Sequence, residues 1–114
     1  MSKSHEEIWE EWRALVNMAP KEIEDWLETD ASKSVGADSG DGESKGRKSA
    51  RRIVEIKRTN KDDLSESDWD HMGEVVGYIK RHGAQVPDDP EDSDWARSMK
   101  NWGHDPWGEN GMAA

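Results

Sequence analysis

The chain has 114 residues, no cysteine and a formal net charge of -10 at pH 7. This length suits one domain with one core, and the lack of cysteine excludes disulfides and thiolate metal sites. Charged residues make up 37% of the chain while Leu, Ile, Val and Phe together number only 14, a mixture that leans toward disorder. Seven tryptophans offset this deficit, because each can bury on the order of 150 to 250 Å². We therefore expect a folded, tryptophan-rich core.

The first predicted helix begins after Ser4. A serine followed three places later by Glu7 matches a capping box, which satisfies backbone donors at a helix start. The apolar residues that follow recur at the spacing of one helical face: Ile8, Trp12, Leu15 and Val16. We expect this helix to end near Met18.

Pro20 suits the first turn of a second helix, where its missing amide proton has no cost. Ile23, Trp26 and Leu27 give that helix a buried face, and Thr29-Asp30 closes it. The next stretch, residues 31–46, is rich in glycine and serine, so we predict a long flexible internal loop there.

Two further helices are predicted after this loop. One runs from about Ser49 to Thr59, and the next is capped by Ser65 or Ser67 and stops at Gly83, just after three residues that can carry positive charge. The apolar stripe of the later helix is the most regular in the chain: Trp69, Met72, Val75, Val76 and Ile79.

The prolines of residues 87–90 indicate a connector, and Ser93 can cap a short last helix that ends at Gly103. We expect His104 to pair with the last carbonyls of that helix, and residues 108–114 to form a disordered tail. The sequence thus predicts an all-α fold, an irregular bundle of about five helices, as a single domain over residues 4–107.

Positive charge is concentrated in one window of an otherwise acidic chain. Residues 45–61 contain eight cations and a single acid, Glu55, so this window carries +7 and the other 97 residues carry -17. The candidate phosphate-contacting residues are Lys45, Arg47, Lys48, Arg51, Arg52, Lys57, Arg58 and Lys61.

A helical wheel at about 100° per residue places five of these cations in an arc of roughly 140°, opposite the apolar side of the helix. The five are Arg47, Lys48, Arg51, Arg52 and Arg58. An outward-facing basic arc suits phosphate contacts, which predicts DNA binding. Two alternatives remain: the cations pair with carboxylates of the same molecule, or they engage an acidic protein surface or a second copy of this chain. An acidic chain that mimics DNA is a third and less attractive possibility.

Other chemistry has little support in the sequence. The four histidines are scattered without ligand spacing, so we expect no metal and no cofactor. No nucleophile motif or phosphate-binding glycine loop is present, which favours a protein that is not an enzyme. The chain opens with acidic residues rather than an apolar run, and no stretch approaches a membrane span. We therefore expect a cytoplasmic protein with no membrane partner.

Four stretches together resemble a known family. They are VNM at 16–18 with EDWL at 24–27, SARRIVEI at 49–56, VVGYIKRH at 75–82 and NWGHDP at 101–106. In that order they are similar to domain of unknown function 3140, a microbial and fungal family, over about residues 6 to 107. Its members are often labelled DNA-binding proteins, which the resemblance implies here. The family pattern has a glycine before the arginine pair where this chain has Ala50.

Overall fold

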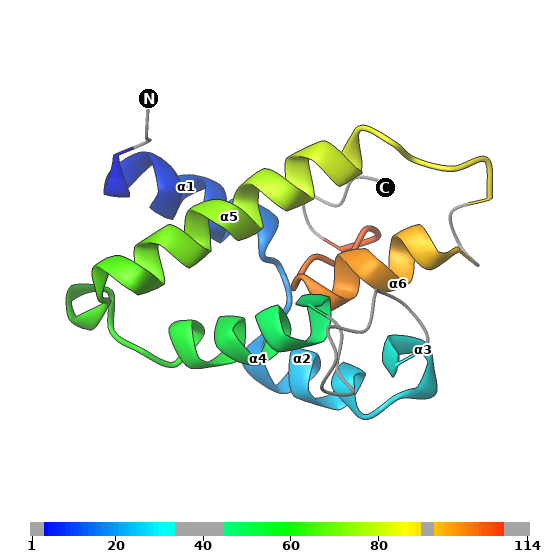
Figure 1. Cartoon of the computed structure of the whole chain (residues 1–114), viewed down its shortest axis with the longest axis horizontal. Helices are drawn as coiled ribbons and strands as arrows, with labels where there is room; N and C mark the ends of the chain where they lie inside the picture. The colour runs from blue at the N-terminus through cyan, green and yellow to red at the C-terminus, as the bar shows by residue number, and fades with distance from the viewer. Residues whose placement is uncertain (1–3, 34–44, 90–92, 109–114) are drawn as a thin grey trace.

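The computed structural model describes residues 4–33, 45–89 and 93–108, and every regular element within them is helical. The all-α prediction is therefore confirmed. Figure 1 shows α1 lying beside α5 and α2 beside α4, and α6 packs against α2, α3, α4 and α5. Buried side chains from α1, α2, α4, α5 and α6 form one hydrophobic core. Within these described residues, none of the helices has the length and apolar character needed to cross a membrane.

Helix α1 spans His5–Leu15, and its first turn is capped as predicted, because the Ser4 side chain accepts a hydrogen bond from the Glu7 amide. The helix ends before Met18, and Val16 and Met18 are buried in the non-helical segment that follows. Long-range hydrogen bonds hold this segment: the Asn17 side chain donates to the Asp105 carbonyl at 3.0 Å and accepts from the Asp105 amide at 2.7 Å. A packed segment therefore replaces the last predicted turn of the helix.

Helix α2 spans Pro20–Leu27, with Ile23 and Leu27 buried. The predicted loop begins too early, because Asp30–Lys33 forms the short helix α3, in which Ser32 is fully buried. The loop prediction is also wrong at its other end, since α4 spans Lys45–Lys57 and begins four residues before the predicted Ser49. The intervening part of the predicted loop, residues 34–44, lies outside the described residues.

A short 3-10 helix at Lys61–Asp63 connects α4 to α5, which spans Glu66–Gly83. Ser65 is the cap of α5, which decides between the two predicted serines. All five residues of the predicted apolar stripe are buried, and the helix ends at the predicted glycine.

Helix α6 spans Asp94–Asn101 and is capped by Ser93 as predicted. Gly103 adopts a positive φ of 80°, which turns the chain back toward α1. His104 is fully buried, and its Nδ1 lies 2.6 Å from the Leu15 carbonyl oxygen at the end of α1. The predicted pairing with its own helix is thus made by the backbone, since the His104 amide donates to the Met99 carbonyl at 2.9 Å, while the imidazole ties the C-terminal segment to a distant helix end.

Six of the seven tryptophans pack in the core or against it. Trp12, Trp69, Trp95 and Trp102 are buried in the core, and Trp9 and Trp26 are partly buried against it. Trp107 is 40% exposed, so it does not belong to the core. Residues 109–114, most of the predicted tail, lie outside the described part.

Candidate nucleic-acid interface

Helix α4 presents a buried face and an exposed face. Ala50, Ile53 and Ile56 are buried at 0 to 3% exposure and dock the helix on the core. The other side of the helix carries residues that the sequence predicted to contact phosphates, together with the acid Glu55. Those that are exposed are Lys45, Lys48, Arg51 and Arg58, while Arg52 is half-buried.

Arg47 does not belong to this exposed face. It is only 8% exposed, and its Nη1 donates to the Leu27 carbonyl at 2.8 Å and to the Ser32 hydroxyl at 3.0 Å. The carbonyl lies at the C-terminal end of α2, where backbone acceptors lack helical partners. The prediction that Arg47 contacts phosphate on the outer face is wrong, because Ser32 of α3 lies against its guanidinium and no sequence pattern predicted α3.

The Arg47 contact belongs to a buried polar network. The Ser32 hydroxyl donates to Oδ1 of Asn101 at 2.6 Å, and the indole N–H of Trp26 donates to the same oxygen at 2.7 Å. The Asn101 amide in turn donates to the Ser32 carbonyl at 3.3 Å. The network joins α2, α3, α4 and α6, so Arg47 has a structural role.

Lys57 is a second cation whose charged group is bound by backbone carbonyls of the protein itself. Its ammonium donates to the carbonyls of Val16 at 2.9 Å and Met18 at 2.8 Å, the segment that follows α1. Burial lowers the pKa of Lys57, and the nearby Glu22 carboxylate opposes that shift. A partly buried ammonium held by carbonyls is poorly placed to meet a polyanion that lies along the outer face of α4.

Three other cations of the predicted set, Arg58, Arg52 and Lys45, form ion pairs with carboxylates. Arg58 binds Glu24 through two hydrogen bonds of 2.6 and 3.2 Å, and this contact is the main cause of the lowered pKa of Glu24. Arg52 donates to the Ser67 hydroxyl at 2.8 Å and to Asp68 at 3.2 Å. The pKa of Asp68 is lowered first by the Ser65 amide and then by Arg52.

The ammonium of Lys45 lies 3.2 Å from the carboxylate of Glu74, and both side chains are well exposed. The ammonium of Lys61 lies 5.0 Å from the centroid of the Trp9 ring, a cation–π contact away from the outer face of α4. Carboxylate pairs of the kind that the first alternative predicts are therefore described for Lys45, Arg52 and Arg58, and the exposed face of α4 is smaller than the sequence predicted.

A family model described as a protein of unknown function, DUF3140, matches residues 11–100. The chain belongs to this family. The matched part contains all of α4 together with the partners of Arg47, Arg52 and Arg58. No curated protein and no solved structure matches the chain.

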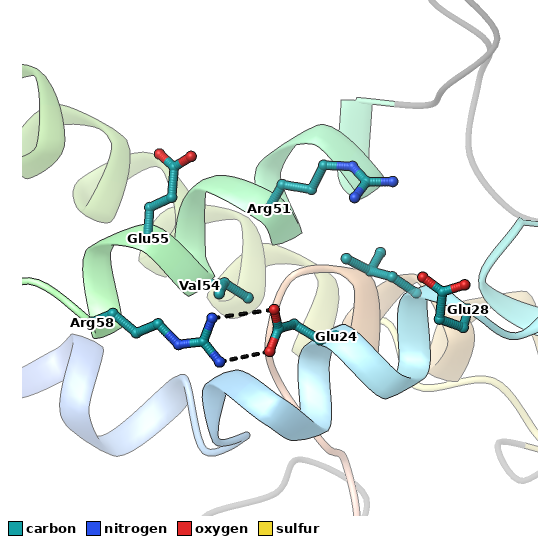
Figure 2. A pocket seen from close by; sticks show the side chains of 7 residues that line it. Glu24, Glu28, Arg51, Val54, Glu55 and Arg58 are labelled. Atoms are coloured by element: carbon teal, nitrogen blue, oxygen red, sulfur yellow. Dashed lines mark hydrogen bonds and ion pairs between the residues drawn. The ribbon is translucent and has the colours of Figure 1, made fainter.

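In this DUF3140 protein a groove of about 370 Å³ runs along the surface where α2 and α4 meet. Figure 2 shows Arg58 and Glu24 facing each other across it, with Arg51 and Glu28 toward the other end. Leu27 and Val54 contribute apolar lining, and Glu55 supplies a third carboxylate. The groove thus combines both signs of charge with a small apolar floor.

Sequence reasoning missed one serine–histidine contact. The Ser49 hydroxyl lies 2.9 Å from Nε2 of His71 on α5, and burial is the main cause of the lowered pKa of His71. Ser49 is 3% exposed in the middle of α4, so the pair links α4 to α5 rather than facing a substrate. No cluster that could hold a metal ion occurs among the described residues.

Proposed function

We propose that this protein binds DNA through phosphate contacts made by the exposed face of α4. The observation that carries the proposal is that Lys45, Lys48 and Arg51 of α4 and Arg58, which directly follows its last residue, are all exposed, with Glu55 as the acid among them. No base readout and no catalytic step are part of the proposal. The cations at 47 and 57 are excluded from the contact set because the fold uses them.

The ion pairs on this face do not prevent phosphate binding. The side chains of Lys45 and Glu74 are 76% and 46% exposed, and those of Arg58 and Glu24 are also about half exposed. Exposed ion pairs contribute little to stability, since water screens them and the long side chains lose entropy. A phosphate oxygen can therefore replace the carboxylate at low cost, which keeps these two cations available.

The helix geometry limits the footprint. Lys45 and Arg58 are thirteen positions apart, about 20 Å at the helical rise per residue, and the four exposed cations of this stretch limit the contact to roughly three or four phosphates. The carboxylates beside the face and the net charge of -10 repel the rest of the DNA. The proposal thus predicts modest, salt-sensitive affinity.

The test is the affinity for a duplex DNA as a function of salt. With roughly three phosphates contacted, the logarithmic slope is expected near -3, and it becomes shallower by about 2 in a double variant Lys48→Gln, Arg51→Gln. Lys21→Gln is the matched control, because it removes one exposed cation from α2. A salt-independent affinity, or an equal effect of the control, contradicts the proposal.

The groove of Figure 2 favours a second candidate, a protein interaction module. Its three carboxylates repel phosphate but suit a protein surface that carries both signs of charge. This candidate predicts that the groove assembles with a protein surface of mixed charge, such as a second copy of this chain, without nucleic acid. Measuring molecular mass in solution at low and high salt distinguishes the two, since only self-association raises the mass of the protein alone.

A further inference from the structure

A second groove, between α1 and the C-terminal end of α4, differs in charge from the rest of the molecule. It has a volume of about 330 Å³ and is lined mainly by Trp9, Trp12, Arg13, Ile56 and Lys57. None of its lining residues is a carboxylate, although the chain as a whole carries -10. Its chemistry suits a ligand with an anionic group and an apolar or aromatic body.

Lys57 supplies the inner positive charge of this groove. Two of its three N–H donors are directed at the carbonyls of Val16 and Met18, and in the described part of the chain it has no ion pair with a carboxylate. Carbonyl dipoles orient the ammonium but do not neutralise its charge. The nearby Glu22 carboxylate offsets part of the Lys57 charge, but it does not line the groove, and Arg13 adds a second cation to the lining, so the lining itself carries only positive charge.

Arg13, which lines the groove, and Lys61, which lies over the Trp9 ring, supply further positive charge. Arg13 is exposed in the last turn of α1 and has no carboxylate partner within residues 4–33, 45–89 and 93–108. Lys61 is exposed as well and lies over the Trp9 ring. Acids also occur nearby, since Asp62 and Asp63 follow Lys61 and Glu10 follows Trp9, so the cationic region is short.

Trp9 is placed to act as a stacking surface. It is half-buried, and an edge contact of 6.2 Å and 60° with Trp69 fixes it against the core. The cation of Lys61 covers one face of the ring, and the lysine side chain is long enough to turn aside toward a phosphate. Stacking of a planar base on a fixed aromatic ring beside cations is the common mode of single-strand binding.

We propose that this groove binds one nucleotide of single-stranded DNA, with the base stacked on Trp9 and the phosphate held by Arg13 and Lys61. The inference rests on the proposed function for its ligand class and adds that the single strand is the preferred form. Bases of a duplex are stacked on one another and cannot reach the ring of Trp9. The volume of about 330 Å³ suits one nucleotide rather than a longer stretch.

The experiment compares binding of a single-stranded oligothymidine of about 10 nucleotides with a duplex of equal length. The variants Arg13→Gln and Lys61→Gln are expected to weaken single-strand binding by about three- to fivefold each. Trp9→Leu is expected to weaken it by at least about fivefold, and Trp9→Phe to retain most of it. Arg81→Gln, which removes an exposed cation from α5, is the matched control.

A second measurement does not depend on the outer face of α4. Thymidine monophosphate is expected to shift the indole N–H resonance of Trp9 in nuclear magnetic resonance spectra, and thymidine without phosphate to shift it much less. If Trp9→Leu does not fold, Trp9→Phe, Arg13→Gln and Lys61→Gln still decide the question.

The outcomes separate the two proposals. Loss of binding in Lys48→Gln and Arg51→Gln, with none in Arg13→Gln and Lys61→Gln, overturns the groove and leaves the α4 face in place. The reverse pattern supports the groove and overturns the α4 face. An unmoved Trp9 resonance together with equal affinity for single strand and duplex also overturns the groove.

Discussion

The guanidinium of Arg47 donates a 2.8 Å hydrogen bond to the carbonyl of Leu27, the last residue of α2. A residue that the sequence assigned to phosphate binding thus closes a helix end inside the protein. Arg47→Met is expected to lower the free energy of unfolding by about 2 to 4 kcal/mol, because it leaves buried acceptors without a charged donor. Urea denaturation measures this change.

Lys48→Gln is the control for Arg47→Met, since the neighbouring lysine is exposed on the same helix. Its unfolding free energy is expected to stay within about 0.5 kcal/mol of the unaltered chain. Equal unfolding free energies for Arg47→Met and Lys48→Gln would show that the buried contact of Arg47 contributes nothing to stability.

Replacing either of two glycines by alanine is expected to change the stability of the protein, in opposite directions. A Cβ at Gly103 would lie 2.9 Å from Cγ1 of Val16, and its φ of 80° is unfavourable for alanine. Gly103→Ala is therefore expected to destabilise the fold by about 1 to 3 kcal/mol.

At Gly73, in the middle of α5, a Cβ would meet Ile8 at an ordinary 3.7 Å. Gly73→Ala is expected to stabilise the protein by about 0.5 to 1 kcal/mol, because alanine favours the helix. Thermal unfolding of both variants checks the pair: a stabilised Gly103→Ala variant is inconsistent with the described turn, and a destabilised Gly73→Ala variant is inconsistent with the open space described at Gly73.

His104 predicts a pH dependence of stability. A carbonyl oxygen can only accept, so Nδ1 carries a proton and donates to Leu15, and burial is the main cause of the lowered pKa of His104. The unfolded state then binds a proton more readily than the folded state. Stability from the neutral ring is fully present above the unfolded pKa of about 6.5 and falls as the pH drops below it, by at most about 1.4 kcal/mol per pH unit for one proton.

Urea denaturation between pH 7 and 5 measures this slope. Burial also lowers the pKa values of His71 and His82, so both contribute with the same sign. His104→Asn keeps a donor near the Leu15 carbonyl and is expected to reduce the slope without abolishing it. A slope that His104→Asn leaves unchanged refutes the role assigned to His104.

The cap of α5 gives a further stability test. The Ser65 hydroxyl accepts from the Asp68 amide at 3.1 Å, and the Asp68 carboxylate accepts from the Ser65 amide at 3.0 Å. Ser65→Ala is expected to cost about 1 kcal/mol, measured by urea denaturation. Ser67→Ala, which loses only an exposed bond from Arg52, is expected to cost about 0.5 kcal/mol or less.

Local patterns predicted most of the helical fold. Ser4, Ser65 and Ser93 each cap a helix, and the stripe from Trp69 to Ile79 is buried throughout. These signals are local, because capping and helical periodicity depend on residues within a few positions of one another. Helix α3 and the early start of α4 were not predictable in this way, since composition alone favoured a loop there.

The candidate site was predicted less completely than the fold. A helical wheel gives the direction of Arg47 and Lys57 relative to the axis of α4 but not what lies in that direction. The carbonyls that they bind belong to Leu27, Val16 and Met18, 20 to 41 positions away. Arg47 and Lys57 are therefore buried or half-buried, while their sequence neighbours Lys48 and Arg58 are exposed.

The sequence by itself determined the helical class, the caps, the aromatic core and the concentration of positive charge in residues 45–61. Only the tertiary structure decided which of those charges face water, because the carbonyls that bind Arg47 and Lys57, and so keep them off the exposed face of α4, belong to distant segments. It also brought Arg13 and Lys57 into the lining of one groove, with Lys61 over the Trp9 ring, an arrangement that no pattern along the chain indicates.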